Sequence, residues 1–169
     1  MIECHLRYGI GSWCYSNSTI KNSIQKTCNQ FISMIFKSNN KNLLELKMEE
    51  NNIMSIEQLL FLNIGLTMFK IQTGSYPSTL ANLIVQPTRT RITRSRNRLQ
   101  SENSRIQLTK QALAYKGPRF WNEIPDFVKF SNGERTTYRT LNDFKKNLKS
   151  YINSIGIDET NRITNEIFH

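Results

Sequence analysis

The chain has 169 residues, a net charge of +10 and a hydrophobic content of 38%, which suits one domain with a core of ordinary size. No run of about 18 apolar residues is present, so we expect no membrane-spanning helix, and the first residues lack the layout of a secretory signal. Three cysteines without a Cys-x-x-Cys pair exclude a disulfide framework and a zinc ribbon, so an intracellular, reduced setting, nuclear or cytoplasmic, is expected.

Two helices are predicted in the first third of the chain. From Ser18 or Thr19 to about Phe36, apolar residues recur at spacings of three and four, which is typical of a helix with one apolar stripe. The stripe consists of Ile20, Ile24, Cys28, Phe31 and Ile35. A shorter, weaker helix is predicted between the Asn-Asn pairs at residues 39–40 and 51–52.

The next helix is predicted to be the central helix of the fold. Ser55-x-x-Gln58 is a capping-box pattern, and Gly74 lies where a C-cap glycine belongs. Between them nearly every helical face is apolar, and a helix that is apolar all round is a buried one. Pro77 is predicted to begin a short helix, and Pro87 closes the neutral half of the chain.

Residues 88–98 read Thr-Arg-Thr-Arg-Ile-Thr-Arg-Ser-Arg-Asn-Arg. The five arginines are Arg89, Arg91, Arg94, Arg96 and Arg98. They alternate with polar residues and lack helical apolar spacing, so we predict an exposed strand or an arm that becomes ordered on a partner. Because a guanidinium group matches phosphate oxygens, the RNA or DNA backbone is the expected partner. Residues 105–115 alternate in a way that permits one or two short strands.

The charge of the chain is concentrated around this segment. Residues 86–149 contain 15 Lys and Arg against 5 Asp and Glu, which is +10, whereas the remaining residues carry 8 of each sign. A basic region beside a neutral helical one outlines a polyanion-binding surface, and a solvated face that keeps the protein soluble is the alternative interpretation.

The stretch Tyr115–Pro125 combines turn-forming and aromatic residues. Gly117-Pro118 predicts a turn, with Pro118 as the first residue of a short helix that Pro125 ends. The turn would direct Phe120 and Trp121 at one spot, which is either a local core cluster or a base-stacking surface. We interpret the stretch as an aromatic plug that packs under neighbouring helices and determines how the basic segment meets the next helix.

The last clear helix is predicted to begin at a Thr140-x-x-Asp143 cap. Its apolar stripe consists of Leu141, Phe144, Leu148, Tyr151, Ile152 and Ile155. The outer face carries Lys145, Lys146 and Lys149, which either contact phosphates or are solvated charges. Gly156 is predicted to end the helix, and the tail to His169 to be frayed.

Two motifs in the second half of the chain carry a resemblance to a known family. The first is Tyr-x-Gly-Pro-x-x-Trp-Asn-x-x-Pro, made by Tyr115, Gly117, Pro118, Trp121, Asn122 and Pro125. The second is Phe-Lys-Lys-x-Leu-Lys-x-Tyr at residues 144–151. Together they resemble the C-terminal region of reverse transcriptases from non-LTR retrotransposons, of the LINE-like, jockey type. Tyr8-Gly9-Ile10-x-x-Trp13 also resembles the segment after the polymerase thumb, so the resemblance covers roughly residues 6–153.

The resemblance implies an RNA-directed DNA polymerase, but this chain lacks the residues for that chemistry. Polymerisation requires carboxylates that hold two metal ions. The three aspartates, Asp126, Asp143 and Asp158, do not form the paired-Asp turn of the family. Cys4, Cys14 and Cys28 have the wrong spacing for a zinc knuckle. We therefore expect no enzymatic activity, no metal and no cofactor in this chain.

The expected fold is mainly α, an irregular helical bundle with a small β-hairpin or extended segment near residues 90–115. One domain overall would comprise a neutral helical scaffold (1–85), a basic C-terminal segment (86–155) and a frayed tail (156–169). The expected function is that of a catalytically incomplete C-terminal fragment, which binds the RNA or DNA backbone through the five arginines and three lysines. Its other expected partner is the upstream polymerase domain of the same element, and no membrane is expected.

Two alternatives stay open at this point. The chain could be a purely structural brace for the polymerase thumb, without nucleic-acid binding of its own. It could also be a host protein that has recruited the tail of such an element as a nucleic-acid module.

Overall fold

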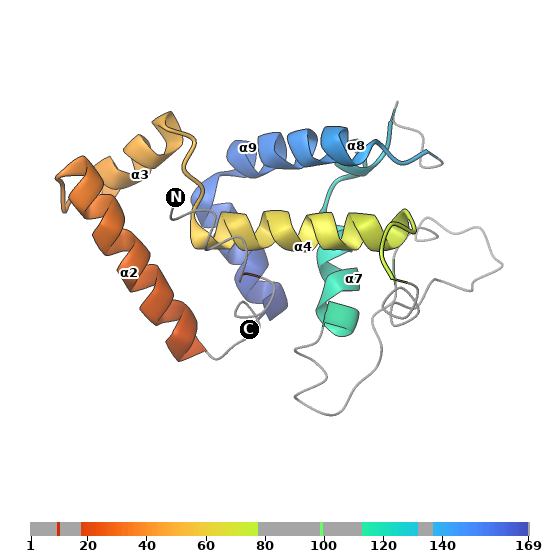
Figure 1. Cartoon of the computed structure of the whole chain (residues 1–169), viewed down its shortest axis with the longest axis horizontal. Coiled ribbons are helices and arrows are strands. Elements are labelled where there is room, and N and C mark those ends of the chain that lie inside the picture. The colour runs from red at the N-terminus through yellow and green to blue at the C-terminus, as the bar shows by residue number, and fades with distance from the viewer. Residues whose placement is uncertain (1–9, 11–17, 78–98, 100–112, 132–136, 169) are drawn as a thin grey trace. The chain divides into compact units, whose positions relative to one another are not determined.

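The structure is a computed structural model that describes residues 10, 18–77, 99, 113–131 and 137–168. Within these residues the chain forms six helices: α2 (Ser18–Phe36), α3 (Lys41–Glu50), α4 (Ile56–Gln72), α7 (Leu113–Glu123), α8 (Asp126–Lys129) and α9 (Leu141–Phe168) (Figure 1). The mainly α prediction is therefore confirmed, and the described ranges contain no strand. The hairpin expected near residues 90–115 lies mostly outside them, and its last three residues are helical because they begin α7.

The chain divides into two compact units, residues 1–60 and 61–169. The division falls within α4, so the first turn of α4 belongs to one unit and the rest to the other. Both helices of the first unit occur where the sequence predicts them. Asn40 caps α3 by accepting a hydrogen bond from the amide of Asn42 at 3.1 Å, and Asn51 forms its C-cap.

The apolar stripe of α2 is largely open to solvent. Ile20, Phe31 and Ile35 are 49%, 41% and 62% exposed, and the neighbouring Met34 is 64% exposed. Cys28 is half-buried on the same stripe. Burial, and next the charge of Glu57, raise the pKa of the Cys28 thiol, so this cysteine is a poor nucleophile.

The caps that the sequence predicts for α4 are confirmed at both ends. At the start, the amide of Ser55 donates to Oε1 of Gln58 at 2.9 Å, and the amide of Gln58 donates to Oγ of Ser55 at 3.2 Å. At the end, Gly74 has φ +70°, Ser75 donates to the carbonyl of Lys70 at 2.8 Å, and Gly74 donates to that of Ile71 at 3.2 Å. These two bonds define a Schellman motif, which requires the left-handed backbone that glycine adopts without strain.

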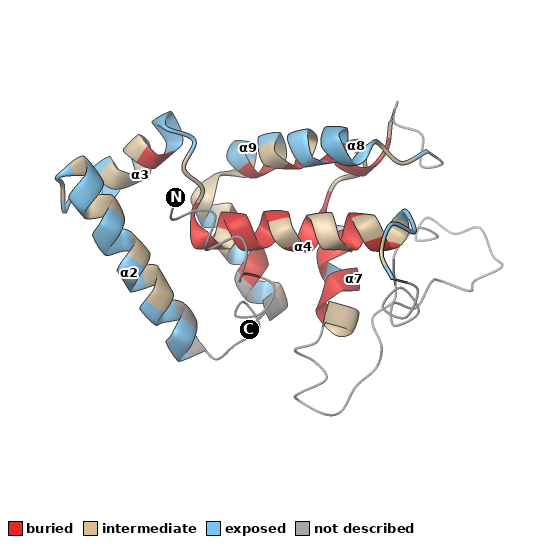
Figure 2. Cartoon of the chain, in the orientation of Figure 1, coloured by how far each residue is buried: buried red, intermediate tan, exposed pale blue. Residues whose placement is uncertain are grey.

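In the second unit α4 packs against α9 in antiparallel orientation. The ring centroids of Phe69 and Phe144 are 4.2 Å apart, and those of Phe61 and Tyr151 are 6.4 Å apart. Between these pairs, a Cβ placed on Gly65 would lie 2.5 Å from Cδ2 of Leu148. The contacts run in opposite directions along the two helices at steps of three to four residues. The first segment of α9 buries one face, whereas α4 is buried on most sides, since the consecutive residues Leu59, Leu60, Phe61 and Leu62 are all at most 4% exposed (Figure 2).

Helix α7 passes through Gly117-Pro118, so the predicted turn at this dipeptide is wrong. The helix begins five residues before Pro118, and Pro118 lies inside it, where it cannot donate the usual bond to the carbonyl four residues earlier. Gly117 serves close packing here: a Cβ on it would lie 2.6 Å from Sδ of Met68. The predicted end before Pro125 is confirmed, since α7 stops at Glu123.

In the part of the chain that the structure describes, one β-bridge joins the segments on either side of residues 132–136. Phe130 pairs with Tyr138 in antiparallel orientation, flanked by a 3.0 Å bond from Ser131 to the Thr137 carbonyl and a 3.2 Å bond from Arg139 to the Lys129 carbonyl. Phe130 and Tyr138 thus form a non-hydrogen-bonded antiparallel pair, in which the two side chains lie close together. Their rings stack with 4.9 Å between the centroids. The bridge thus fixes Tyr138 beside the aromatic core of the second unit.

Burial raises the pKa of Tyr138, and we expect a loss of stability at alkaline pH for this reason. The unfolded chain releases a phenolic proton near its ordinary pKa of about 10. Below that pH the phenol is protonated in both states, and the protein has its full stability. As the pH rises toward the higher pKa of the folded state, ionisation favours the unfolded chain and this stability is lost. Urea unfolding of the wild type should show a steeper fall in stability above about pH 10 than that of Tyr138→Phe. Equal slopes for the two proteins would contradict this expectation.

Helix α9 begins at the predicted cap and continues past the predicted end. Oγ1 of Thr140 accepts from the amide of Asp143 at 3.2 Å and donates to Oδ2 of the same residue at 2.7 Å. Gly156 does end the first helical segment, because its φ of +74° and ψ of −179° are not helical. The frayed tail is wrong for residues 157–168, which form a second helical segment. Oγ1 of Thr160 donates to the Gly156 carbonyl at 2.6 Å, and Thr160 is fully buried.

Candidate nucleic-acid interface

The structure places one of the two predicted groups of cationic residues. Lys145, Lys146 and Lys149 lie on the first segment of α9. The other group, Arg89, Arg91, Arg94, Arg96 and Arg98, lies outside the described residues. The geometry of the candidate interface is therefore that of the three lysines, which we call the α9 lysine face, and of the described residue next to the arginines, Leu99.

The α9 lysine face results from the way in which α9 is anchored. Phe144, Leu148 and Ile152 are fully buried and fix which side of the helix faces the core. At 100° per residue, the three lysines project to one flank of that buried stripe. Lys145 and Lys146 are exposed and Lys149 is half-buried. None of the three lysines forms an ion pair with a carboxylate in the described ranges.

The arginines in the described part of the second unit are engaged within the protein. The guanidinium group of Arg119 lies 4.5 Å from the ring centroid of Tyr115, a cation–π distance. That of Arg139 donates to the carbonyl of Phe127 from Nε at 3.3 Å and from Nη2 at 3.2 Å. These contacts hold both groups in place, so we do not include them in the candidate interface.

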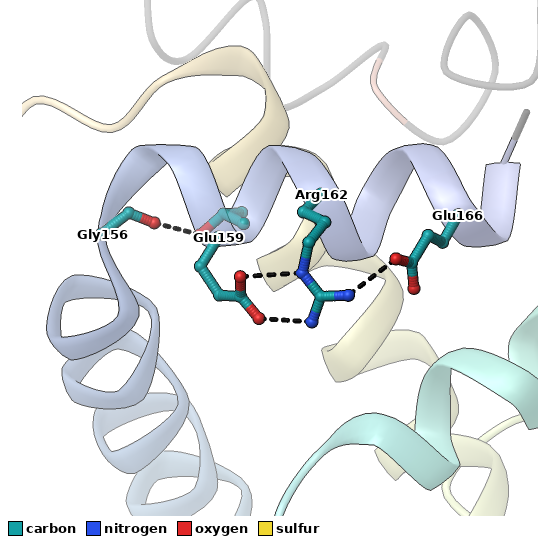
Figure 3. Close-up of polar contacts among 5 residues, drawn as sticks. Gly156, Glu159, Arg162 and Glu166 are labelled. Atoms are coloured by element: carbon teal, nitrogen blue, oxygen red, sulfur yellow. Dashed lines mark hydrogen bonds and ion pairs between the residues drawn. The ribbon is translucent and has the colours of Figure 1, made fainter.

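Arg162 is held most firmly, between two carboxylates one turn away on either side (Figure 3). Its Nε and Nη2 donate to Glu159 at 2.8 and 2.6 Å, and its Nη1 donates to Glu166 at 2.6 Å. The hydrogen bond from Arg162 holds the pKa of the Glu159 carboxyl below its usual range. This bidentate geometry satisfies the guanidinium fork, which excludes Arg162 from phosphate binding in this conformation.

The aromatic residues of the Tyr115–Pro125 stretch belong to the core. Phe120 is fully buried and packs edge-on against Phe61 with 4.5 Å between centroids, and Trp121 is 2% exposed. The Trp121 ring lies 5.9 Å from that of Phe144, with the ammonium group of Lys129 5.1 Å from its centroid. No open ring face remains on either residue, so of the two interpretations the core cluster is the one that the geometry supports.

Other members of the predicted motif lie around this cluster. Gly117 and Pro118 are buried within α7, whereas Tyr115 in its first turn and Pro125, the N-cap residue of α8, are half-buried. Asn122 has a contact that the sequence did not indicate: its side chain bonds the backbone of Leu99, 23 residues earlier. No local pattern could have identified this pair, because only the tertiary fold brings the two residues together.

The described residues show no site for a metal ion and no helix that could cross a membrane. No group of three or more His, Cys, Asp or Glu side chains is gathered among them. Cys28 is the one cysteine within these ranges, and Cys4, Cys14 and both histidines lie outside them. Helices that are long and apolar enough to span a bilayer are absent from the same part of the chain.

Comparison with known proteins found no matching family model, no matching curated protein and no matching solved structure. What bears on function therefore lies in the residues of this chain. These are the position of the positive charge in the sequence, the α9 lysine face, which forms no ion pair within the described ranges, and the tie between Asn122 and Leu99.

Proposed function

We propose that this chain binds the sugar–phosphate backbone of RNA or DNA through Arg89–Arg98 and the α9 lysine face. The observation that carries the proposal is the position of the charge: the full +10 falls within residues 86–149, and the rest of the chain is neutral. Clustered Lys and Arg on one part of a domain are the electrostatic footprint of nucleic-acid binding, whereas a merely soluble surface disperses its charge.

The chemistry of the two groups fits a phosphate backbone. Residues 88–98 contain five arginines and no acidic residue, so their guanidinium forks have no carboxylate within the segment to compete with phosphate oxygens. The lysines of the α9 lysine face supply compact charges that suit phosphate contacts without base readout. Together the eight cations would form a sequence-independent binding surface.

In this proposal the protein is a catalytically incomplete C-terminal fragment of a non-LTR retrotransposon reverse transcriptase, and it positions template or target for an absent polymerase domain. The absence of polymerase chemistry in this proposal agrees with the positions of the three aspartates. Asp126 lies 3.9 Å from Nζ of Lys129, and Asp143 closes the cap of α9. Asp158 is exposed beside Gly156. They lie on separate turns of the chain, whereas two-metal catalysis requires carboxylates gathered around ions about 4 Å apart.

Fluorescence anisotropy with labelled single-stranded RNA and DNA tests the proposal. We expect binding at low salt, with an affinity that falls steeply as salt is added. Replacing the five arginines of residues 89–98 by alanine should reduce the slope of log K against log salt by roughly 3 to 5. Replacing Lys145, Lys146 and Lys149 by alanine should reduce it by about 2.

The matched control removes three lysines from the neutral part of the chain, Lys26, Lys37 and Lys41, which are all exposed. It lowers the net charge as much as the α9 variant does, and we expect it to leave the slope nearly unchanged. Equal slopes for the control and the α9 variant would show that only net charge matters. Absence of binding at low salt, or unchanged binding by the five-arginine variant, would refute the proposal.

The second candidate function is a structural brace for the polymerase domain, and the exposed apolar side chains favour it. Met34, Ile35 and Leu46 in the first unit are 64%, 62% and 56% exposed, and Phe127 in the second is 61% exposed. Large exposed apolar side chains are typical of protein contacts when they gather into a patch. If this function holds, the isolated chain self-associates, and co-expression with an upstream polymerase fragment rescues it. A well-behaved monomer without that partner argues against it.

A further inference from the structure

One line of residues along α2 has the spacing with which helices pack side by side. Its members follow one another at alternating steps of four and three residues, a heptad repeat that keeps them on one side of a helix. Four of the five are exposed and one is half-buried, on a helix that is exposed along most of its length (Figure 2). We name this line the α2 seam, and its members are Ile20, Ile24, Thr27, Phe31 and Met34.

The α2 seam can be buried without leaving a polar group unsatisfied. Oγ1 of Thr27, its one polar member, donates to the carbonyl of Ser23 at 3.0 Å. The hydroxyl therefore has a hydrogen-bond partner before any contact forms. The other members are large apolar side chains, and such side chains are typical of protein contacts when they gather on one exposed surface.

The charges of α2 favour a second copy of this chain over an acidic partner. An acidic helix would be matched by lysines at the flanking positions of the seam, where ion pairs between packed helices form. Helix α2 has two lysines and no acidic residue. Lys26 lies roughly 120° around the helix from the seam, and Lys21 occupies a flanking position only in the first turn.

The remaining flanking positions of the seam are uncharged. Because two copies of a neutral seam bring no like charges together, α2 is compatible with itself as a partner. These positions are occupied by Ser23, Cys28, Gln30 and Ile35.

We propose that the α2 seam binds α2 of a second copy of this chain in antiparallel orientation and forms a symmetric dimer. In this orientation Ile24 packs against Met34 of the second copy, and Thr27 packs against Phe31. Each small residue thus meets a large one, whereas a parallel pair would stack Phe31 on Phe31 and Thr27 on Thr27. The antiparallel pair also places opposite ends of the two helix dipoles beside each other.

The size of the seam determines the expected strength of this dimer. Helix α2 has 19 residues, so it is about 28 Å long. Two such helices in contact along their length bury roughly 600–1,000 Å² in total, which is less than a permanent interface requires. We therefore expect a reversible dimer with a dissociation constant on the order of 1–100 µM.

Sedimentation equilibrium of the full chain, over roughly 1–200 µM, tests the proposal. The wild type should show a reversible equilibrium between monomer and dimer. Met34→Lys and Phe31→Lys should each raise the dissociation constant by roughly 10- to 100-fold, because both copies bring a charge into the contact. Met34 is 64% exposed, so its replacement should leave the monomer folded, and circular dichroism establishes this for each variant.

Phe127→Lys is the matched control, since it also replaces an exposed apolar residue by lysine, but in the second unit. This variant should dimerise as the wild type does. A monomer at every concentration, an assembly larger than a dimer, or equal weakening by Phe127→Lys overturns the proposal.

Disulfide formation between variants tests the orientation. Ile24→Cys and Met34→Cys are each made in a chain whose three native cysteines are replaced by serine, and the two variants are mixed and oxidised. An antiparallel dimer predicts a mixed disulfide between the two variants, whereas a parallel dimer predicts disulfides within each variant only, which would overturn the proposal. The inference goes beyond the proposed nucleic-acid binding and does not depend on it, and neither experiment contains nucleic acid.

Discussion

Replacing Trp121 by alanine is expected to lower the free energy of unfolding by about 3–5 kcal/mol, the usual range for truncating a buried tryptophan. Trp121 is 2% exposed and lies 5.9 Å from Phe144 and 6.4 Å from Tyr138, measured between ring centroids. Its loss also removes the ring beside the ammonium group of Lys129, which is itself buried. A cavity and a less stabilised charge result from one substitution.

Urea unfolding measures this effect, and Phe127→Ala provides the control. Phe127 belongs to the adjacent helix α8 but is 61% exposed, so its truncation should cost about 1 kcal/mol or less. The dependence on urea should keep the same slope in both variants, since the folded state remains as compact. A loss below about 1.5 kcal/mol in Trp121→Ala would contradict the placement of the indole in the core.

The second large effect is expected where α4 and α9 approach most closely. Leu148→Ala should cost about 2–5 kcal/mol, because Leu148 is fully buried. Gly65→Ala should cost about 2 kcal/mol: the new Cβ lies 2.5 Å from Cδ2 of Leu148, which outweighs a gain in helix propensity of about 1 kcal/mol.

The double variant Gly65→Ala with Leu148→Ala makes the test sharper. Once Leu148 is shortened, the new methyl group fills part of the space, so Gly65→Ala should stabilise the protein in this background. The double-mutant cycle is expected to show a favourable coupling of about 2–3 kcal/mol. Ile124 and Phe120 are the next neighbours of the new Cβ, at 3.6 and 3.7 Å, distances of ordinary contact. Additive costs would mean that the two helices do not meet at Gly65.

Local signals predicted the helices whose ends are determined locally. The reciprocal bonds of Ser55 with Gln58, the C-cap at Gly74 and the cap of Thr140 with Asp143 each involve residues at most five positions apart along the chain. Such bonds form wherever the sequence provides them, because they satisfy backbone groups that a helix end leaves free. The bounds of α2 and the burial of Phe144, Leu148 and Ile152 followed from periodicity for a similar reason, whereas Leu141, predicted on the same stripe of α9, is 40% exposed.

The features that were predicted wrongly depend on the rest of the fold. Gly117-Pro118 has the composition of a turn, but burial of Phe120 and the close approach of Met68 make a continuous helix the better packed arrangement. Beyond Gly156, the small share of apolar residues concealed a helix in which Thr160 and Thr164 are buried.

In the candidate interface, too, local spacing predicted some features, whereas one contact depends on the tertiary fold. The outward position of Lys145, Lys146 and Lys149 followed from helical spacing, because three fully buried residues of α9 determine its orientation. The ion pairs of Arg162 with Glu159 and Glu166 could also be predicted from the sequence, since pairs three and four residues apart are typical of helices. The contact between Asn122 and Leu99 could not be predicted in this way, because spacing within one element says nothing about a residue 23 positions away.

The pairing of α4 with α9 has a consequence for how this protein tolerates change in its length. Phe69 and Phe144 stack although 75 residues separate them, so the core forms by closing a large loop. The entropy of loop closure grows only with the logarithm of length, and doubling such a loop costs about 0.6 kcal/mol. Through loop-closure entropy alone, insertions between Pro77 and Leu99 would therefore cost the core little.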